Sequence, residues 1–402
     1  MLAQYLLQYY HHFMQNTPLP PLSLYIHFPW CIQKCPYCDF NSHAVKGDLP
    51  EVHYIDALLN DLDQDIAEFH EARPIQSIFM GGGTPSLFSA NQLDRLLTAM
   101  QQYLVFADDI EITLEANPGT FESDKFTDYR AIGINRLSIG IQSFNDAHLK
   151  RLGRVHSADE AIHAVAIARQ AGFDNFNLDL MFGLPESEEH DSLHDVQQAI
   201  ELQPAHISFY QLTLEPNTYF HKYPPVLPGD DAIFNQQLAC QKLLAEHGYQ
   251  QYEISAYAKK GKQCRHNLNY WSFGDYLGIG AGAHGKITRS LPNNIVRTSK
   301  PKQPEQYLRQ IKDDRLCQEI KQGDLPLEFI MNHLRLKQGF SLATYMQRTG
   351  LPAQSLQPAL TNCLQQELLL EHQQHYYQCS EKGWHFLDNI LENFLGTDTT
   401  DA

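Results

Sequence analysis

Long hydrophobic runs are missing from this sequence of 402 residues. A helix that crosses a bilayer needs about 20 consecutive apolar residues, and no such stretch exists here, so a membrane span is not expected. Residues 1–21 also lack the basic start and small-residue cleavage site of a secretory signal, and the arginines of a transit peptide. We therefore expect a short N-terminal arm at 1–21 and a cytoplasmic protein.

Positive charge and paired cysteines are also in short supply. The chain has 30 lysines and arginines against 47 aspartates and glutamates, which gives a formal net charge of −17. Such a chain would repel phosphates, so nucleic acid is not expected as a partner. The eight cysteines show no spacing typical of a disulfide framework. A close cysteine cluster in a reducing cytoplasm instead indicates metal or redox chemistry.

Short apolar runs alternate with longer amphipathic ones over the first 250 residues or so. Such alternation predicts βα units around a parallel sheet. The expected strands are residues 23–28, 76–80, 110–116, 135–141, 175–182 and 206–212. The expected helices are residues 52–70, 90–103, 122–131, 158–170, 192–202 and 231–246.

Distinctive polar or glycine-rich residues follow each expected strand, among them GGGTPS, EANPG and IQSF. Ligands of βα folds bind at the carboxyl ends of the strands, so we expect the six strand ends to build a single site. Past about residue 300 the periodicity is mostly helical, which predicts a small helical or winged-helix domain. Its expected elements are helices at 325–336, 341–350 and 356–372, then a hairpin and a final helix within 373–394.

The most specific feature is a loop that carries Cys31, Cys35 and Cys38 in the spacing CxxxCxxC. A structural zinc ion takes four protein ligands, so zinc would need a distant fourth one. An iron–sulfur cluster held by three thiolates would keep one iron open for a small molecule. Ordinary core cysteines are the third interpretation. Three thiols at this spacing, directly after a strand, favour the cluster over both alternatives.

This loop, with the aromatic Tyr37 before its last cysteine, resembles that of the radical S-adenosylmethionine (SAM) enzymes. In that superfamily the open iron of a 4Fe–4S cluster binds the methionine part of SAM, and one electron from the cluster cleaves a carbon–sulfur bond. The resemblance implies a partial (β/α)6 TIM-like barrel and cluster ligation by Cys31, Cys35 and Cys38. It also implies an electron donor such as a flavodoxin or ferredoxin.

The resemblance extends over nearly the whole chain and is closest to the oxygen-independent coproporphyrinogen III oxidase-like family. Matching stretches include YIHFPWC (25–31), EANPGT (115–120), RLSIGIQSF (136–144) and NLDLMFGLP (177–185). The match implies SAM contacts from Tyr25, Tyr37, Gly82, Gly83, Thr84, Glu115, Gln142, Arg154 and Asp179, with Thr213 as a weaker candidate. Glycine backbone allows close approach of a ligand.

Two kinds of protein within this family must be distinguished. The decarboxylating oxidase carries a further cysteine two residues after the third, where this chain has Phe40. The oxidase also has a longer segment before its cluster loop, whereas 30 residues precede Cys31 here. Both differences favour the haem chaperones of the HemW type, which resemble this chain in reading CPYCDF at this point.

The segment His266-Asn267-Leu268-Asn269-Tyr270-Trp271 matches the HNxxYW motif of these haem chaperones. Imidazole is a common axial ligand of haem iron, and tyrosine and tryptophan offer flat apolar area for a porphyrin. His266 is therefore the candidate haem ligand, with Cys264 and His284 as rivals. A histidine that simply bonds backbone groups beside an aromatic patch is the alternative that the residues alone would favour.

The leading hypothesis is a haem chaperone that binds haem, a 4Fe–4S cluster and SAM and delivers haem to acceptor proteins such as membrane respiratory enzymes. It would be cytoplasmic, with peripheral contact to the membrane left open, as is SAM cleavage. The alternatives are an oxygen-independent coproporphyrinogen III dehydrogenase, which converts propionates to vinyls, and a zinc-loop binding protein. The expected domains are the arm at 1–21, the barrel with the haem-motif extension at 22–298, and a helical C-terminal domain of the HemN type at 299–402.

Overall fold

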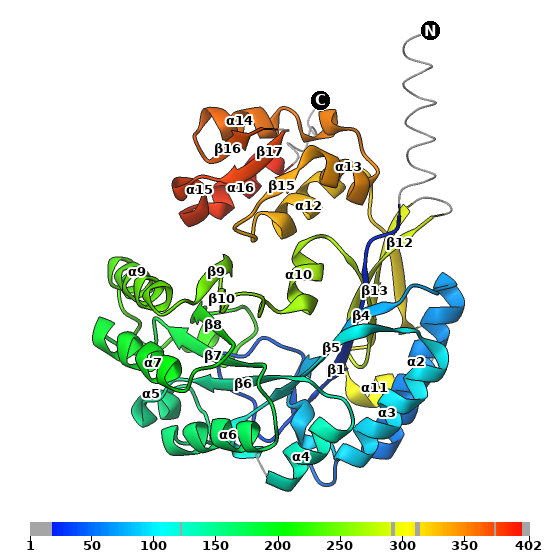
Figure 1. The fold of residues 1–402 in the computed structure, drawn as a ribbon, viewed down its shortest axis with the longest axis vertical. Helices are drawn as coiled ribbons and strands as arrows, with labels where there is room; N and C mark the ends of the chain where they lie inside the picture. The colour runs from blue at the N-terminus through cyan, green and yellow to red at the C-terminus, as the bar shows by residue number, and fades with distance from the viewer. Residues whose placement is uncertain (1–17, 121–122, 291–293, 310–313, 374, 396–402) are drawn as a thin grey trace.

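Six parallel strands lie in the predicted order within a mixed twelve-stranded sheet (Figure 1). The structure is a computed structural model that describes residues 18–120, 123–290, 294–309, 314–373 and 375–395, so the arm predicted at 1–21 lies almost wholly outside the described residues. The six strands are β1 (Leu22–Phe28), β4 (Ile75–Gly82), β5 (Phe106–Ala116), β6 (Arg136–Gln142), β7 (Phe176–Phe182) and β8 (His206–Gln211). The predicted partial barrel is confirmed.

Burial on both faces explains why these strands read as continuous apolar runs. In β1, with the sequence LSLYIHF, only Tyr25 is not fully buried. Parallel strands are covered by helices on one face and by the barrel interior on the other, so a continuous apolar run is expected of them. The side chains of all six strands contribute to one large hydrophobic core.

The predicted helices connect the strands and cover the outer face of the arc (Figure 1). They are α2 (Glu51–Phe69), α3 (Ala90–Tyr103), α4 (Ser123–Ala131), α6 (Ala158–Gln170), α7 (Glu189–Glu201) and α9 (Asp230–Glu246), with the short helices α5 (Asp146–Arg151) and α8 (Tyr219–Lys222) between them. Local sequence sets several of the helix starts. Ser157, for example, forms a capping box with Glu160 at the start of α6.

Further elements extend the sheet at both edges, and the sequence did not predict them. One edge carries β11 (Asp275–Ile279), β12 (His284–Arg289), β13 (Asn294–Ser299) and β14 (Leu316–Glu319), and the other β9 (Gln250–Glu253) and β10 (Ala256–Ala258). β11 runs parallel to β1 and pairs with it from Leu22 to Ile26. Between the edges, α10 (Arg265–Trp271) packs on β1, β4 and β11. The remaining short elements are β2 (Trp30–Cys31), β3 (His43–Ala44) and α11 (Pro304–Leu308).

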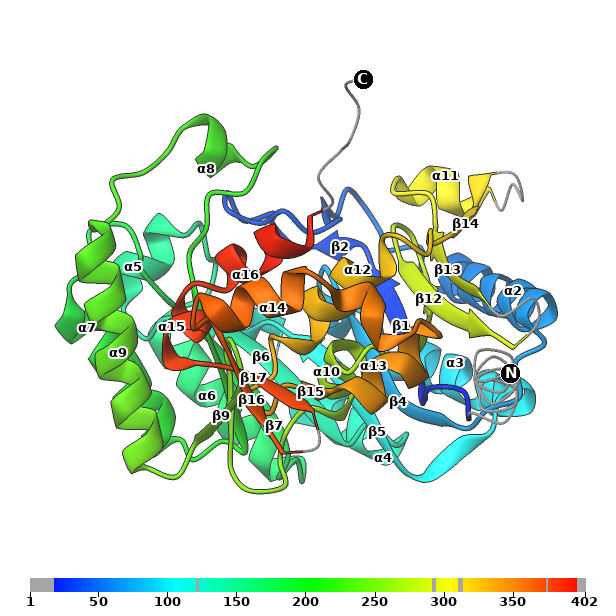
Figure 2. The same cartoon turned by 90° about the horizontal axis from the view of Figure 1, so that it is seen from above.

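The C-terminal segment forms a small helical unit over the open side of the arc, as Figures 1 and 2 show. Its elements are α12 (Leu325–His333), β15 (Phe340–Ser341), α13 (Leu342–Thr349), α14 (Ala359–Gln365), β16 (Leu369–His372), β17 (Tyr376–Cys379), α15 (Glu381–His385) and α16 (Leu387–Phe394). The prediction that a helix continues to residue 372 is wrong. Leu369–His372 instead pairs with β17, because Leu369 alone enters the core while the next three residues face outward.

The core of this C-terminal unit includes side chains that precede residue 299. Phe273 and Ile295 are buried together with Phe329, Phe340 and Tyr345. The two hydrophobic layers therefore share residues, and the boundary proposed at 298/299 stays a prediction. Within the described residues, no helix is both long and apolar enough to span a membrane.

Candidate functional site

A cavity of about 930 Å³ opens at the carboxyl ends of the barrel strands. Residues from the cysteine loop, the strand ends and α10 all line it, including Tyr25, Cys38, Gly82, Glu115, His266 and His284. The sequence prediction that separate strand ends build one site is therefore met for these residues. A cavity of this size falls in the range of known ligand sites.

The cysteine loop, which we define as residues 31–42, starts at the end of β2 and returns along β3. Trp30 pairs with His43, so the two ends of the loop are held side by side. Within it the Cys38 amide donates to the Cys35 carbonyl over 3.2 Å, and Lys34 Nζ donates to the Phe40 carbonyl over 3.0 Å. The loop is otherwise irregular, and Phe40 is 60% exposed.

Three free thiols gather in this loop, each partly buried. Burial raises the pKa of Cys31 and of Cys38, and the neighbouring cysteines raise both further. Iron neutralises thiolate charge, so the cost of gathering these thiols falls when they ligate a cluster. Among the described residues, no three His, Cys, Asp or Glu side chains are arranged to hold a single metal ion. The donor set fits a polynuclear cluster better than a mononuclear site.

The glycines at the end of β4 are required by the protein's own packing. A Cβ on Gly82 would lie 2.3 Å from the His27 ring, and one on Gly83 would lie 2.5 Å from the Trp30 carbonyl oxygen. Gly82 also has a φ of 109°, which favours glycine. Gly82 lines the cavity, but the space that its missing side chain leaves is filled by His27, where the sequence suggested an approaching ligand.

Glu115 and Asp179 end neighbouring stretches of the sheet and influence each other. Burial, and secondarily the Asp179 charge, raises the pKa of Glu115 to about 8. Its Oε2 accepts a hydrogen bond of 3.0 Å from the Gly82 amide. Asp179 Oδ1 accepts from Asn177 at 2.7 Å and Oδ2 from Ser138 at 3.2 Å, so this carboxylate already has polar partners. Glu115, which lines the cavity, is the better placed to receive a ligand.

Arg154 connects the cysteine loop to the strand ends. Its guanidinium donates to Asn117 Oδ1 and to the Gly140 carbonyl, each at 2.6 Å, and approaches Cys35 Sγ at 3.7 Å. Asn117 in turn donates to Thr84 Oγ1 over 2.7 Å. This chain of contacts holds a cation beside a cysteine sulfur, where it would stabilise a thiolate.

The remaining predicted SAM contacts lie close to the cavity without lining it. Gln142 accepts a hydrogen bond of 2.8 Å from the Tyr210 hydroxyl at the end of β6, in a backbone conformation with φ 74°. The Tyr37 ring packs near Phe220 at 6.4 Å. Thr213 is exposed beyond β8, and no structural observation supports a role for it.

His266 lies on α10, buried against two aromatic rings at the cavity wall. Its ring centroid is 5.2 Å from that of Phe79 and 6.4 Å from that of Tyr25. Nδ1 contacts Ser77 Oγ at 3.2 Å, while within the described residues no hydrogen bond reaches Nε2. Burial, with a smaller effect of Arg136, lowers the pKa of His266 to about 3, so the ring is neutral at pH 7.

The two rival haem ligands differ in access to the cavity. Cys264 is completely buried at the start of α10, where its thiol contacts Glu111 Oε1 at 3.6 Å, outside the cavity lining. His284 is exposed and lines the cavity. The structure thus favours the two histidines over the cysteine by position.

Some cavity residues were not singled out from the sequence. His27 lies between the Tyr25 hydroxyl, 2.9 Å from Nδ1, and the Asn41 carbonyl, 2.8 Å from Nε2. A strand places every second residue on one face, so its position two residues after Tyr25 could have revealed it. Tyr276 and Arg297 also line the cavity, but they come from strands that the sequence did not predict.

Comparisons with known proteins agree with this geometry. Residues 25–196 match the Radical SAM superfamily, and residues 320–386 match the HemN C-terminal domain. The heme chaperone HemW of Escherichia coli K12 is 50% identical over 380 residues, which cover 94% of this chain and 99% of the relative. That of Haemophilus influenzae is 52% identical over 382 residues, 94% and 98% of the two chains. The chain belongs to the HemW family.

Membership of this family confirms the predicted resemblance and assigns a 4Fe–4S cluster and SAM as cofactors. The more distant heme chaperone HemW of Bacillus subtilis is 32% identical over 384 residues. The solved structure of coproporphyrinogen III oxidase (HemN) from Escherichia coli, a radical SAM enzyme, has a TM-score of 0.78 and covers 95% of this chain and 92% of its own. Its identity of 22% shows the fold alone, so the oxidase alternative is not favoured.

Proposed function

We propose that this protein is a haem chaperone, which binds haem beside a 4Fe–4S cluster and SAM and passes the haem to acceptor proteins. The observation that carries the proposal is the shared cavity. Cys38 of the cysteine loop, Glu115 of β5 and His266 of α10 come from distant parts of the chain and line the same space. A haem on His266 would thus lie in the compartment that the two other cofactors reach.

The three cysteines are the proposed cluster ligands. Thiolates are the usual ligands of iron–sulfur clusters, and Arg154 beside Cys35 Sγ favours the ionised form. When bound, the cluster and SAM supply one-electron radical chemistry. The protein's own contribution is to hold these groups in the half-enclosed cavity and to limit their contact with water.

Side chains around the cavity are the proposed SAM contacts. The carboxyl group of Glu115 can accept hydrogen bonds from an amino group or a ribose, and the Tyr25 hydroxyl lies 2.9 Å from His27 Nδ1 on the opposite side. Further contacts are proposed, on the family resemblance, for Tyr37, Gly82, Gly83, Thr84, Gln142, Arg154 and Asp179.

His266 is the proposed axial ligand of the haem iron. Metal ligation needs a neutral imidazole with a free nitrogen, and the low pKa of His266 keeps the ring neutral. The contact from Nδ1 to Ser77 orients the ring and leaves Nε2 for the iron. Tyr270 and Trp271, also on the cavity wall, offer aromatic faces to the porphyrin.

The remaining partners follow from the same proposal. Membrane respiratory enzymes would be among the haem acceptors, and a flavodoxin or ferredoxin would supply electrons to the cluster. A chaperone with such acceptors would reside in the cytoplasm and contact the membrane peripherally. These assignments extend what the names of the relatives say of those proteins.

Haem titration of the anaerobically reconstituted protein tests the proposal. We expect wild type to bind one haem with the absorption spectrum of a histidine ligand, and His266→Ala to lose that spectrum. His163→Ala, on α6 away from the cavity, is the matched control. An unchanged spectrum and stoichiometry in His266→Ala would remove this ligand from the proposal.

A turnover assay separates the chaperone from the oxidase. The reconstituted protein is incubated with coproporphyrinogen III, SAM and a reductant, and the products are separated by chromatography. We expect no protoporphyrinogen, because an exposed phenylalanine, Phe40, stands where the oxidase has its fourth cysteine. Formation of protoporphyrinogen would overturn the chaperone proposal. Transfer of haem to an apo-cytochrome is the corresponding positive assay.

A further inference from the structure

One side of the cavity carries several cationic or hydrogen-bonding groups in an otherwise acidic protein. We call Arg297 on β13, Lys302 before α11 and His284 on β12 the basic wall, and all three line the cavity. The charges of Lys302 and Arg297 both lower the pKa of His284, which indicates that the three groups are close. Two cations therefore face the cavity beside a neutral imidazole.

The main chain holds the basic wall against the cysteine loop. Asn41 Nδ2 donates to the Lys302 carbonyl over 2.9 Å and to the Ala281 carbonyl over 2.8 Å. The Gly282 amide donates to the Pro301 carbonyl over 2.8 Å. The backbone of Lys302 is thus fixed, whereas its side chain is exposed and its ammonium group has no hydrogen-bond or ion-pair partner among the described residues.

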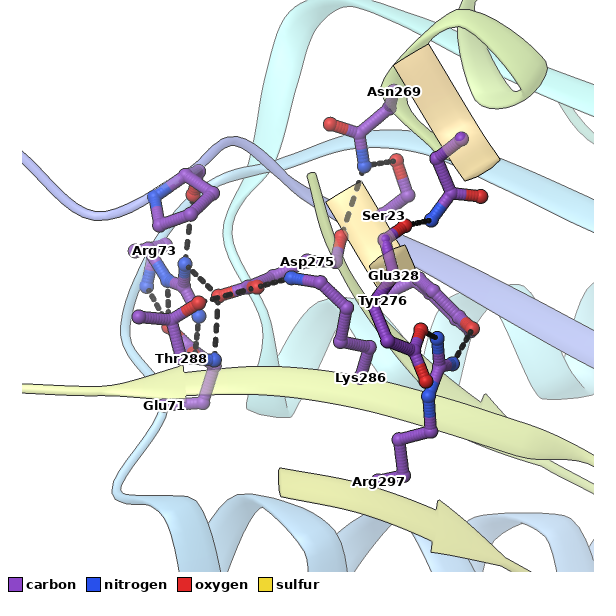
Figure 3. A network of polar contacts seen from close by, with 12 residues as sticks. Ser23, Glu71, Arg73, Asn269, Asp275, Tyr276, Lys286, Thr288, Arg297 and Glu328 are labelled. Atoms are coloured by element: carbon purple, nitrogen blue, oxygen red, sulfur yellow. Dashed lines mark hydrogen bonds and ion pairs between the residues drawn. The ribbon is translucent and has the colours of Figure 1, made fainter. Parts of the chain in front are cut away.

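A row of aromatic rings connects His266 to the basic wall. Tyr270 lies one helical turn after His266 on α10, and its ring centroid is 5.1 Å from that of Tyr276. The Tyr276 hydroxyl accepts a hydrogen bond of 3.3 Å from Arg297 Nη1, as Figure 3 shows. An imidazole, a flat apolar surface and a group of cations therefore follow one another along one wall.

Arg297 is partly neutralised by the C-terminal unit. Its Nη2 forms an ion pair with Glu328 of α12 (Figure 3). Asp39 and Glu115 are the carboxylates that line the cavity, and Glu115 is largely protonated at pH 7 because of its raised pKa. Lys302 is consequently the cation with most of its charge still available to a ligand.

We propose that the basic wall binds the two propionate carboxylates of haem, with Lys302 as the principal contact and Arg297 and His284 as supporting donors. The inference rests on the proposed haem binding and deepens it. A propionate-bearing porphyrin ligated by His266 along the aromatic row would direct its acidic edge toward Lys302. Porphyrins that lack free carboxylates would lose this recognition, so the wall selects haem by its acid groups.

The test compares ferric haem with haem dimethyl ester, which keeps the iron and the ring but has no free carboxylate. Both are titrated into the reconstituted full-length protein at the same low detergent concentration. We expect wild type to bind haem about tenfold more tightly than the ester. Lys302→Gln should raise the Kd for haem by about 3- to 10-fold and leave the Kd for the ester unchanged.

Two further variants control for charge and folding. Lys242→Gln removes an exposed lysine of α9 outside the cavity lining and should change neither Kd. The double variant Arg297→Gln/Glu328→Gln removes both charges of an ion pair, so that no lone charge is left behind. It should also weaken haem more than the ester.

The possible results separate the inference from the proposed function. Equal Kd values for haem and its ester in wild type would overturn the basic wall as a propionate site while haem binding stands. An equal loss for both ligands in Lys302→Gln would also overturn it. Failure of wild type to bind either ligand would overturn the proposed function and the inference together.

Discussion

The cysteine loop and the wall built around α10 face the same cavity but are held in place differently. The loop is irregular, with Ile32 and Phe40 exposed, and its hydrogen bonds run mostly to its own neighbours. The wall rests on Asp275, which is completely buried. Its carboxylate accepts from Lys286 and from Arg73 at 2.8 Å each, and from the Thr288 amide at 2.9 Å (Figure 3).

The same network positions α10. Asn269 on that helix donates to the Asp275 carbonyl and to Ser23 Oγ, each at 2.9 Å, so the helix is tied to β11 and β1 (Figure 3). Satisfied buried polar networks rigidify the structure around them. The difference indicates that the haem side is preformed by the protein, whereas the cysteine loop depends on its cluster for rigidity.

Removal of one cluster ligand should give the largest effect. Cys31→Ala leaves two thiolates, so we expect the iron content after reconstitution to fall from about four per chain to nearly none. Because the α10 wall does not depend on the cluster, haem binding should persist. Iron analysis and haem titration measure the two properties on the same sample. Cys317→Ala, at an exposed cysteine of β14, is the control and should keep its iron.

Removal of the central carboxylate should affect the α10 wall. Asp275→Asn leaves the buried Lys286 without its ion-pair partner, and we expect a loss of about 3–5 kcal/mol in the free energy of unfolding. Haem affinity should fall as well, because Asn269 and α10 lose their support. Denaturant unfolding and haem titration measure these effects.

The matched control for that variant is Asp56→Asn, which removes an exposed carboxylate paired with Arg95. Exposed ion pairs contribute about 0–1 kcal/mol, so this variant should be nearly as stable as wild type. Equal stability of the Asp275 and Asp56 variants would contradict the view that the network holds the wall.

Glu115 should make the stability of the cofactor-free protein depend on pH. Its folded-state pKa of about 8 lies above the ordinary value of 4.5, so the stability that it contributes is complete below pH 4.5 and is lost as the pH rises toward 8. Glu115→Gln stays neutral and should avoid that loss. We expect the variant to gain on the order of 1–3 kcal/mol relative to wild type between pH 5 and pH 8.

Thermal unfolding of both proteins across this pH range tests the sign. Asp56→Asn serves again as the control, and its stability relative to wild type should stay flat. A difference between the Glu115 variant and wild type that shrinks with rising pH would show that the carboxyl group is ionised in the folded protein.

The ion pair between the sheet and the C-terminal unit should give the smallest effect. Glu328→Gln breaks the contact with the partly buried Arg297, and we expect a loss of about 1 kcal/mol and a fall in Tm of about 1–3 °C. Glu246→Gln, which breaks an exposed pair with Lys242, should change Tm less. A larger shift for the Glu246 variant would contradict a role of Arg297 and Glu328 in joining the two parts.

The sequence predicted one side of the cavity far better than the other. The six barrel strands and the cysteine spacing are local patterns, and the order of the strands follows their order in the chain. β11 and β12 escaped prediction because glycines interrupt them. A Cβ on Gly278 would lie 1.8 Å from the His284 carbonyl oxygen, so glycine there allows two strands to approach, although it reads as a turn signal.

Long-range partners set the second limit of sequence reasoning. Asp275 finds Arg73 from a position 202 residues away, and a single sequence does not reveal that a buried carboxylate has a cation to meet. The same holds for Arg297 and Glu328, which join across 31 residues and two structural units. The residue roles proposed here for SAM binding remain predictions from motif matches.

A crystal structure of the reconstituted protein with SAM and haem, grown without oxygen, tests the central claim most directly. The account predicts haem iron bound to His266 Nε2 in the cavity that also holds SAM, with Cys31, Cys35 and Cys38 on the cluster. Haem bound at another place, with His266 still confined to its contact with Ser77, would contradict it.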